Sequence, residues 1–249
     1  MLLRLSPAAS RRKWALRLLS LSPHYFIEGD QEAGAGLTLD ERLELATARW
    51  AESRSRLSER LVQPHLRPDS VVLDYGCGPG FLTKAVAAVA GRTFGCDISR
   101  GALACARILN GGAGIEYLEA HATGLRAIPD GGVDVVASFA LAQHVTDREL
   151  AEILAHCHRK LRRGGRLLLH FHDLGEGWRS EEQWRGDRSL RGRARYRFGL
   201  HCFGRDDASV ETLASRCGFT HGKCVPIRDW VDGDFDDICR QQLFCAERS

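Results

Sequence analysis

The sequence predicts an α/β fold in which helices cover both faces of a mostly parallel sheet. Two observations predict it. From residue 70 onward short apolar runs alternate with helical patterns, and a glycine-rich turn joins the first run to the first helix. This alternation is typical of parallel strands, because each crossover between parallel neighbours needs a long connection that is usually a helix. No internal repeat or flexible linker interrupts the pattern, so we expect one domain at residues 65–249.

The expected elements follow one another along this domain. The expected strands are residues 70–75, 93–97, 115–119, 133–139, 166–171, 220–227 and 241–246. The expected helices are residues 81–90, 100–110, 147–161 and 206–217. Ser99 is the expected cap of the second of these helices, since a serine side chain can accept from the free N–H groups of the first turn.

Residues 1–64 are expected to form a helical extension ahead of the domain. Residues 1–27 contain five basic side chains and no acid, and Trp14, Ala15, Leu18 and Leu19 fall on one face of a helix. One interpretation is an ordinary helix that packs on the domain or covers its site, and the alternatives are a mitochondrial presequence or a membrane-surface helix. A loop at 29–38 and a helix at 39–63, ending before Pro64, are expected to follow.

Composition excludes several classes of protein. With 44% hydrophobic and 27% charged residues, 26 glycines and 7 prolines, the chain is neither collagen-like nor of low complexity. No apolar run approaches the roughly 20 residues of a membrane-spanning helix. The net charge of +3 argues against a general nucleic-acid coat protein. Nine cysteines without a Cys-x-x-Cys pair predict reduced thiols and a cytoplasmic location, with mitochondrial import as the alternative.

The strongest local signal is the glycine-rich turn after the first expected strand. Gly76, Gly78 and Gly80 occupy alternate positions between that strand and a helix. Glycine allows positive φ and a close approach of a ligand, and a helix N-terminus presents free N–H groups. The next strand ends in Asp97, where a carboxylate can accept hydrogen bonds from both hydroxyls of a ribose.

The spacing of the turn separates classes of nucleotide ligand. A dinucleotide fingerprint requires Gly-x-Gly-x-x-Gly, but Phe81 stands at the position of the third glycine. This conflicts with a nicotinamide oxidoreductase. No Gly-Lys-Ser/Thr follows the turn, so a P-loop is excluded as well.

At these residues the chain resembles the class I S-adenosylmethionine-dependent methyltransferases. Asp74-x-Gly76-x-Gly78-x-Gly80 fits that family's acidic and glycine motif at every defined position. Residues 95–99 are similar to its second motif, residues 134–145 to its fourth, and residues 161–165 to its Leu-Lys-Pro-Gly-Gly turn. The resemblance covers residues 65–172. It implies a Rossmann-like seven-stranded sheet ending in an antiparallel hairpin, with S-adenosyl-L-methionine as the cofactor.

The resemblance also implies which residues contact the cofactor. Asp74 and the three glycines would surround the methionine moiety and Asp97 would bind the ribose, with Ile98 and Ser138 as further expected contacts. Many relatives carry Gly-Asp-Ala after the third strand, where this chain has Ala120-His121-Ala122. His121 either stacks on or hydrogen-bonds the adenine, next to Ala122, or points to solvent while a backbone group reads the base.

Two histidines are the candidate catalytic bases. A hydroxyl or ammonium acceptor must lose a proton, which calls for a general base with a pKa near neutrality. His144 follows the fourth expected strand and is the first candidate, and its alternative role is to hold the loop. His172, beside Asp173 after the fifth strand, is the second. His170 and His172 share one face of an extended segment, but the sequence places no third ligand, so no metal site is predicted.

The acceptor is expected to bind near residues 173–205, a position that resembles the family's acceptor-site insertion. This stretch interleaves aromatic residues with arginines, and Gln143, Arg195 and Tyr196 are the candidate substrate contacts. The sequence leaves three interpretations of this stretch: a site for an anionic acceptor with an apolar body, an RNA contact, or a solvated loop. The acidic run at 229–237 is either a solvated turn or a partner for these arginines.

The function predicted from these features is S-adenosylmethionine-dependent methyl transfer to a small-molecule acceptor, at oxygen or nitrogen, by in-line displacement. The Asn/Asp-Pro-Pro-Tyr signature of methylation at exocyclic base nitrogens is absent after the fourth expected strand. Nucleic acid is therefore not the expected partner. The alternative is an RNA or protein methyltransferase, or a non-catalytic RNA-binding relative that uses residues 178–203. The sequence does not predict the oligomeric state.

Overall fold

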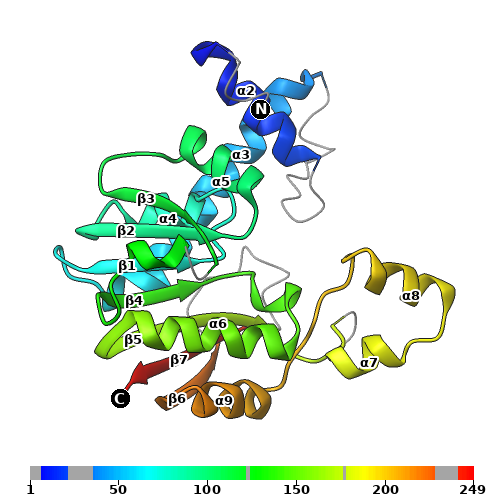
Figure 1. Ribbon diagram of the computed structural model, residues 1–249. Helices are drawn as coiled ribbons and strands as arrows, with labels where there is room; N and C mark the ends of the chain where they lie inside the picture. Colours follow the sequence, from blue (N-terminus) through cyan, green and yellow to red (C-terminus); the bar gives the residue numbers. More distant parts are fainter. Residues whose placement is uncertain (1–6, 22–35, 122–123, 176–177, 228–240) are drawn as a thin grey trace. The chain divides into compact units, whose positions relative to one another are not determined.

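A computed structural model describes residues 7–21, 36–121, 124–175, 178–227 and 241–249 (Figure 1). In this part of the chain seven strands form one sheet in the order β3-β2-β1-β4-β5-β7-β6. The strands are β1 (Val71–Tyr75), β2 (Arg92–Asp97), β3 (Ile115–Glu119), β4 (Val133–Ser138), β5 (Leu161–His172), β6 (Phe219–Pro226) and β7 (Gln241–Arg248). The pairs β2–β3, β1–β4 and β4–β5 are parallel, whereas β7 runs antiparallel to both β5 and β6. The predicted mostly parallel sheet with a C-terminal antiparallel hairpin is confirmed.

The chain divides into two compact units. The first contains Met1–Asp69 and Gly76–Arg126, and the second contains Ser70–Tyr75 and Ala127–Ser249. The division into an extension at 1–64 and one domain at 65–249 stays a prediction. The run at 229–237 lies outside the described residues.

The first unit holds four α-helices in its described residues: α2 (Ala8–Ser20), α3 (Leu39–Leu57), α4 (Phe81–Val86) and α5 (Arg100–Leu109). A capping box at Thr38 and Glu41 starts α3. After Leu57 the chain continues through one π-helical turn and one 3-10 turn, Gln63–His65, so Pro64 lies inside that turn instead of beyond a long helix. Ser99 caps α5 as predicted, its side chain accepting from the N–H of Ala102.

The N-terminal helix α2 packs on α3 and α5. Ala15, Leu16 and Leu19 are buried against Leu43 and Cys105. The expected apolar face was wrong in part, because Trp14 and Leu18 are exposed and Leu16 is buried in their place. Two ion pairs to α3 accompany this packing, Arg12 with Glu44 and Arg17 with Asp40. The interpretation of an ordinary packing helix agrees with these contacts.

The second unit adds α6 (Asp147–Lys160), α7 (Glu181–Gly186), α8 (Leu190–Arg197) and α9 (Asp207–Arg216) to its strands. Strand β5 is longer than predicted because residues 161–165 continue it. Figure 1 shows α7 and α8, in yellow, as a helical pair to one side of the strands of this unit. Nowhere in the described residues is a helix long and apolar enough to cross a membrane.

Candidate active site

The glycine-rich loop of the first unit is tied to the end of β2. Gly76, Gly78 and Gly80 have φ of 81°, 51° and 80°, the left-handed region that glycine reaches without strain. The N–H groups of Gly76 and Cys77 both donate to the carbonyl oxygen of Cys96, at 2.8 and 2.9 Å. Gly78 donates to Oδ2 of Asp97 at 2.9 Å. The loop and the candidate ribose carboxylate therefore form one hydrogen-bonded structure.

Tyr117 supports the same loop from β3. Its hydroxyl donates to the carbonyl oxygen of Asn110 at 3.0 Å, and Nδ2 of Asn110 donates to the carbonyl oxygen of Pro79 at 2.8 Å. A Cβ at Gly80 would lie 2.8 Å from Cζ of Tyr117, and one at Gly95 would lie 2.8 Å from its Cδ1. The third glycine of the motif therefore makes room for a tyrosine ring in addition to forming the turn.

Asp97 combines burial with unused hydrogen-bonding capacity. Its side chain is almost buried, and Oδ1 accepts from the N–H of Ser99 at 2.7 Å. Burial raises the pKa of this carboxyl, while the backbone N–H groups of Ser99, Gly78 and Ile98 oppose the rise. Two carboxylate oxygens offer about four acceptor positions. These contacts leave capacity for a ligand with hydroxyl groups.

Ile98 follows directly and is 85% exposed. An isoleucine that leaves most of its surface in water forgoes on the order of 1.5 kcal/mol or more of burial. A flat apolar ligand group seated beside Asp97 would cover it. A buried carboxylate next to an exposed aliphatic side chain fits a nucleoside, whose ribose is polar and whose base is flat and apolar on its faces.

His121 has both ring nitrogens engaged at the end of β3. Nδ1 accepts from the N–H of Gly124 at 3.0 Å, and Nε2 lies 2.9 Å from Oε2 of Glu119. The contact at Nδ1 makes Nε2 the protonated nitrogen, which donates to Glu119. No acceptor atom remains on the ring for an adenine amine, whereas the ring face, in a half-exposed side chain, remains available for stacking. Ala122 lies outside the described residues.

In the second unit, His172 ends β5 in an aromatic stack. Its ring lies 3.5 Å from that of Trp178 between centroids, at an interplanar angle of 6°, and meets His170 edge-on at 5.1 Å. His172 is buried and its Nδ1 has no hydrogen-bond partner. Burial first, and then the neighbouring His170 and His144, lower the pKa of His172 to about 3. The imidazole is therefore neutral at physiological pH.

His170 holds the exit of β4. Its Nδ1 accepts from the N–H of Ala140 at 3.1 Å, and its Nε2 donates to Oε1 of Gln241 at 2.7 Å. Ala140 has φ of 56°, a conformation that few residues other than glycine adopt. Phe139 stacks on His170 at 5.7 Å. The backbone is therefore strained at Ala140, directly after β4, and the hydrogen bond to His170 holds it in this conformation.

The turn after β4 carries Gln143 and His144 in a 3-10 helix, Ala142–His144. The side-chain Oε1 of Gln143 is buried and has no hydrogen-bond partner, and its backbone oxygen accepts from Phe203 at 2.8 Å. Ser138 precedes the turn, and its hydroxyl donates to the carbonyl oxygen of Tyr75 at 2.9 Å. Ser138 thus holds β1 to β4 within this unit. Asp74 lies buried at the same end of β1.

Arg205 joins these segments. Its buried guanidinium donates from Nε to Oδ1 of Asp147 at 2.8 Å, from Nη1 to the carbonyl oxygen of Ala142 at 2.6 Å and from Nη2 to that of Val145 at 2.6 Å. Its backbone N–H donates to the carbonyl oxygen of His172 at 2.8 Å. One residue thus fixes both the turn that carries Gln143 and His144 and the end of β5.

Comparison with known proteins agrees with this geometry. Residues 73–169 match the model of a protein family described as a methyltransferase domain. This segment runs from the end of β1, just before the glycine-rich loop, to β5, and includes Asp97 and the turn at His144. Over these residues the chain carries a methyltransferase domain.

Curated relatives match about half of this chain. A ubiquinone biosynthesis O-methyltransferase of Pseudomonas paraeruginosa is 34% identical over 122 residues, which are 48% of this chain and 47% of the relative. The enzyme of the same name from Thiobacillus denitrificans is 33% identical over 119 residues, 47% of this chain and 46% of the relative. The chain thus aligns with about half the length of these relatives.

Solved structures share the fold of the methyltransferase domain over most of the chain. A geranyl diphosphate methyltransferase in complex with S-adenosylmethionine superposes with a TM-score of 0.59 at 16% identity, covering 91% of this chain and 95% of that chain. Magnesium protoporphyrin IX methyltransferase from Synechocystis, with bound S-adenosylhomocysteine, superposes with a TM-score of 0.55 at 17% identity, covering 95% and 94%. At these identities the likeness concerns the fold.

The structure groups the predicted site residues of the methyltransferase domain into separate sets. The first unit brings together the three glycines, Asp97, Ile98 and His121, and the second brings His144 near His172. Arg195 and Tyr196 belong to a different cluster. Arg195 donates to the carbonyl oxygen of Leu200 and lies over the Trp184 ring, and the hydroxyl of Tyr196 accepts from Arg185. These partners of Arg195 and Tyr196 all lie between residues 184 and 200.

Sequence reasoning missed Arg205 and the role of Trp178. An arginine among many arginines gives no local signal, because its function depends on carbonyl oxygens some 60 positions away. In the sequence, Trp178 is one of several aromatic residues between positions 173 and 205. The stack on His172 could have been suspected only from its place a few residues after β5.

The low pKa of His172 predicts a measurable effect on acid stability. In the unfolded chain this histidine takes up a proton near pH 6.5, whereas in the folded chain it does so only near pH 3. Between these values the unfolded state binds more protons, so the free energy of unfolding falls with decreasing pH, by up to about 1.4 kcal/mol per pH unit from this group. Denaturant unfolding between pH 7 and 4 should show that His172→Phe, which can keep the stack on Trp178, flattens this slope.

The matched control is His221→Asn, at an exposed position where asparagine tolerates the positive φ of 53°. This control should unfold with the wild-type slope. Equal slopes for wild type and His172→Phe would show that His172 titrates normally in the folded chain.

Proposed function

We propose that this chain transfers the methyl group of S-adenosylmethionine to a hydroxyl oxygen of a small molecule. The observation that carries the proposal is the buried carboxylate of Asp97, hydrogen-bonded to the glycine-rich loop and followed by the exposed Ile98. Asp97 would accept from the ribose hydroxyls and Ile98 would lie against the adenine, with His121 offering its ring face. The relatives named as O-methyltransferases favour oxygen over nitrogen as the methylated atom.

When bound, the cofactor supplies a methyl group on a positively charged sulfur, which an aligned acceptor oxygen can displace in line. The acceptor hydroxyl must lose its proton as the new bond forms. A histidine with a pKa of about 3 cannot hold that proton near neutral pH, so we assign its acceptance to His144. His172 would accept at Nδ1 a hydrogen bond from a different donor group of the acceptor, and Gln143 would accept another at Oε1.

The charges of the insertion argue against an anionic group on the acceptor. Arg179 pairs with Asp187 and Arg185 pairs with Glu181, so part of the positive charge in the insertion is neutralised within the chain. The unpartnered atoms of His172 and Gln143 call instead for hydrogen-bond donors on the acceptor. We therefore favour a neutral hydroxylated acceptor with an apolar body.

The first test of the proposed function is the cofactor site. Calorimetric titration with S-adenosylhomocysteine should show binding to the wild type, and Asp97→Ala should weaken it by about ten- to a hundredfold, which corresponds to roughly 1.5–3 kcal/mol for a hydrogen bond to a charged group. NAD should not bind.

The matched control is Asp69→Ala, which removes a well-exposed carboxylate of the same unit and should leave affinity unchanged. A wild type that binds NAD, or that binds the cofactor equally well without the Asp97 carboxylate, would contradict the assignment. Transfer of labelled methyl groups to a panel of hydroxylated aromatic and isoprenoid acceptors then tests the reaction, which His144→Gln should abolish without loss of cofactor binding.

A further inference from the structure

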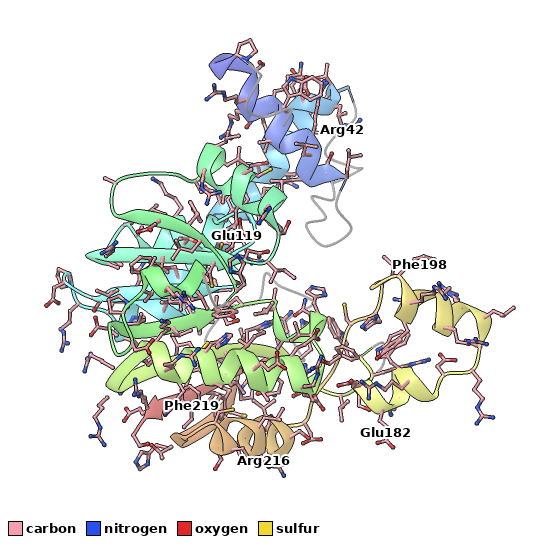
Figure 2. All side chains as sticks on the ribbon, in the orientation of Figure 1. Arg42, Glu119, Glu182, Phe198, Arg216 and Phe219 are labelled. Carbon is pink, nitrogen blue, oxygen red and sulfur yellow. The ribbon has the colours of Figure 1, made fainter. Side chains whose placement is uncertain are left out.

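The outward face of α8 is apolar. Residues 190, 194 and 198 are spaced by four positions, which places them within about 80° around the helix axis. Leu190 is 85% exposed and Phe198 is 70% exposed, and Ala194 between them is exposed as well. Phe198 is labelled in Figure 2, at the end of α8, where its side chain points away from α7. Large side chains thus face water where a surface helix usually carries polar residues.

Arginines flank this apolar face. Residues 188–200 contain five arginines and no acid. Arg191 and Arg197 lie on either side of the line from Leu190 to Phe198, Arg193 lies next to Arg197, and all three are exposed. Among the described residues none of these three has a carboxylate within ion-pair distance, in contrast to Arg179 and Arg185. The face therefore joins exposed apolar surface to uncompensated positive charge.

The opposite face of α8 is packed against its own segment, and this packing leaves Leu190 and Phe198 exposed. Gly192 is buried against the carboxylate of Asp187, and Tyr196 stacks on His201 at 4.7 Å. His201 in turn contacts Phe203, and Trp184 donates from Nε1 to the carbonyl oxygen of Cys202. The segment has its own small core, and Leu190 and Phe198 lie outside it.

We propose that α8 docks on the surface of a lipid bilayer that carries anionic headgroups. An aliphatic and an aromatic side chain on one helical line, flanked by arginines, match the pattern of helices that lie in the membrane interface. The apolar side chains would enter the headgroup boundary while the guanidinium groups bind phosphates. A single strand of RNA fits less well, because Tyr196 and Trp184, the rings that could stack on bases, face inward.

Docking would bring the end of β5 and His172 close to a source of apolar acceptors. The link to acceptor delivery rests on the proposed function, whereas the binding of α8 to a membrane does not. A chain without methyltransferase activity that still binds vesicles would separate the two.

The test is flotation of the full chain with vesicles of phosphatidylcholine, with and without phosphatidylglycerol. We expect binding only when the anionic lipid is present, and weaker binding at high salt. Replacing Arg191, Arg193 and Arg197 by glutamine should weaken binding on the order of a hundredfold, because each arginine near an anionic surface contributes about fivefold. Leu190→Ser with Phe198→Ser should weaken it by about tenfold or more.

Matched control variants test whether vesicle binding depends on where the replaced residues lie or only on the change in charge and apolar surface. Arg126, Arg163 and Arg216 are exposed elsewhere, and their replacement by glutamine makes the same change in net charge. Leu45→Ser with Val89→Ser removes exposed apolar side chains outside α8. Both controls should bind vesicles as the wild type does. Equal losses in the α8 variants and the controls, no vesicle binding by a folded wild type, or binding to polyuridine in its place would each overturn the proposal.

Discussion

Gly80→Ala should lower the free energy of unfolding by about 2–5 kcal/mol. The φ of 80° costs a residue with a Cβ roughly 1–2 kcal/mol. The new methyl group would also overlap the ring of Tyr117, whose Cζ lies 2.8 Å from the Cβ position, and overpacking of this kind costs about 1–3 kcal/mol. Denaturant unfolding monitored by circular dichroism gives the change directly.

Gly101→Ala is the matched control for this result. A Cβ at Gly101 would meet its nearest neighbour, Oγ of Ser99, at 3.7 Å, and the position lies in the first turn of α5. This change should be neutral or stabilise the chain by up to about 1 kcal/mol. Combining Gly80→Ala with Tyr117→Leu should cost less than the sum of the two single changes. A Gly80→Ala protein as stable as the wild type would show that the tyrosine ring does not limit this position.

Arg205→Ala should combine the second large loss of stability with a loss of activity. The change removes three hydrogen bonds from a charged donor and leaves the carbonyl oxygens of Ala142 and Val145 without it, which we expect to cost about 3 kcal/mol. The turn that carries Gln143 and His144 would then lose its anchor. We expect kcat to fall by more than about tenfold at a temperature where the variant is still folded, since misplacement of catalytic groups by about 1 Å is enough for such a loss.

Arg205→Lys tests whether Arg205 positions the turn that carries Gln143 and His144 in addition to stabilising the fold. Lysine keeps the charge beside Asp147 but lacks the planar fork that reaches two carbonyl oxygens at once. Its stability should be partly restored while kcat stays low and the affinity for S-adenosylhomocysteine is unchanged. Arg216→Ala, at an exposed arginine at the end of α9, should change neither property. If Arg205→Lys restored kcat fully, the charge alone would hold the turn.

The sequence predicted most of the sheet because its strands are short, apolar and separated by helices. The expected bounds of β3 match those observed, and those of β1, β2 and β4 differ by one residue at one end. The glycine-rich loop and Asp97 could be related to each other because both sit at strand ends, where a parallel sheet gathers its loops. The Ser99 cap followed from local chemistry alone.

Features that depend on distant contacts were not predicted. The rotation of α2 that buries Leu16 depends on packing against Leu43 and Cys105, and the helices α7 and α8 lie in a stretch whose arginines masked its helical pattern. Ser180 and Ser189 cap these helices, a signal that was available in the sequence. The depressed pKa of His172 requires Trp178, His170 and His144 around it, which no local spacing indicates.

The left-handed backbone of Ala140 restricts which side chains can stand at the exit of β4. The φ of 56° at position 140 strongly disfavours β-branched residues. Glycine, asparagine and aspartate are the residues that tolerate this φ best. Diversity at the exit of β4 must therefore arise at neighbours with ordinary backbone geometry, such as Gln143. If Gln143 binds the acceptor as proposed, libraries that randomise position 143 should change the preferred acceptor at less cost in stability than libraries at position 140.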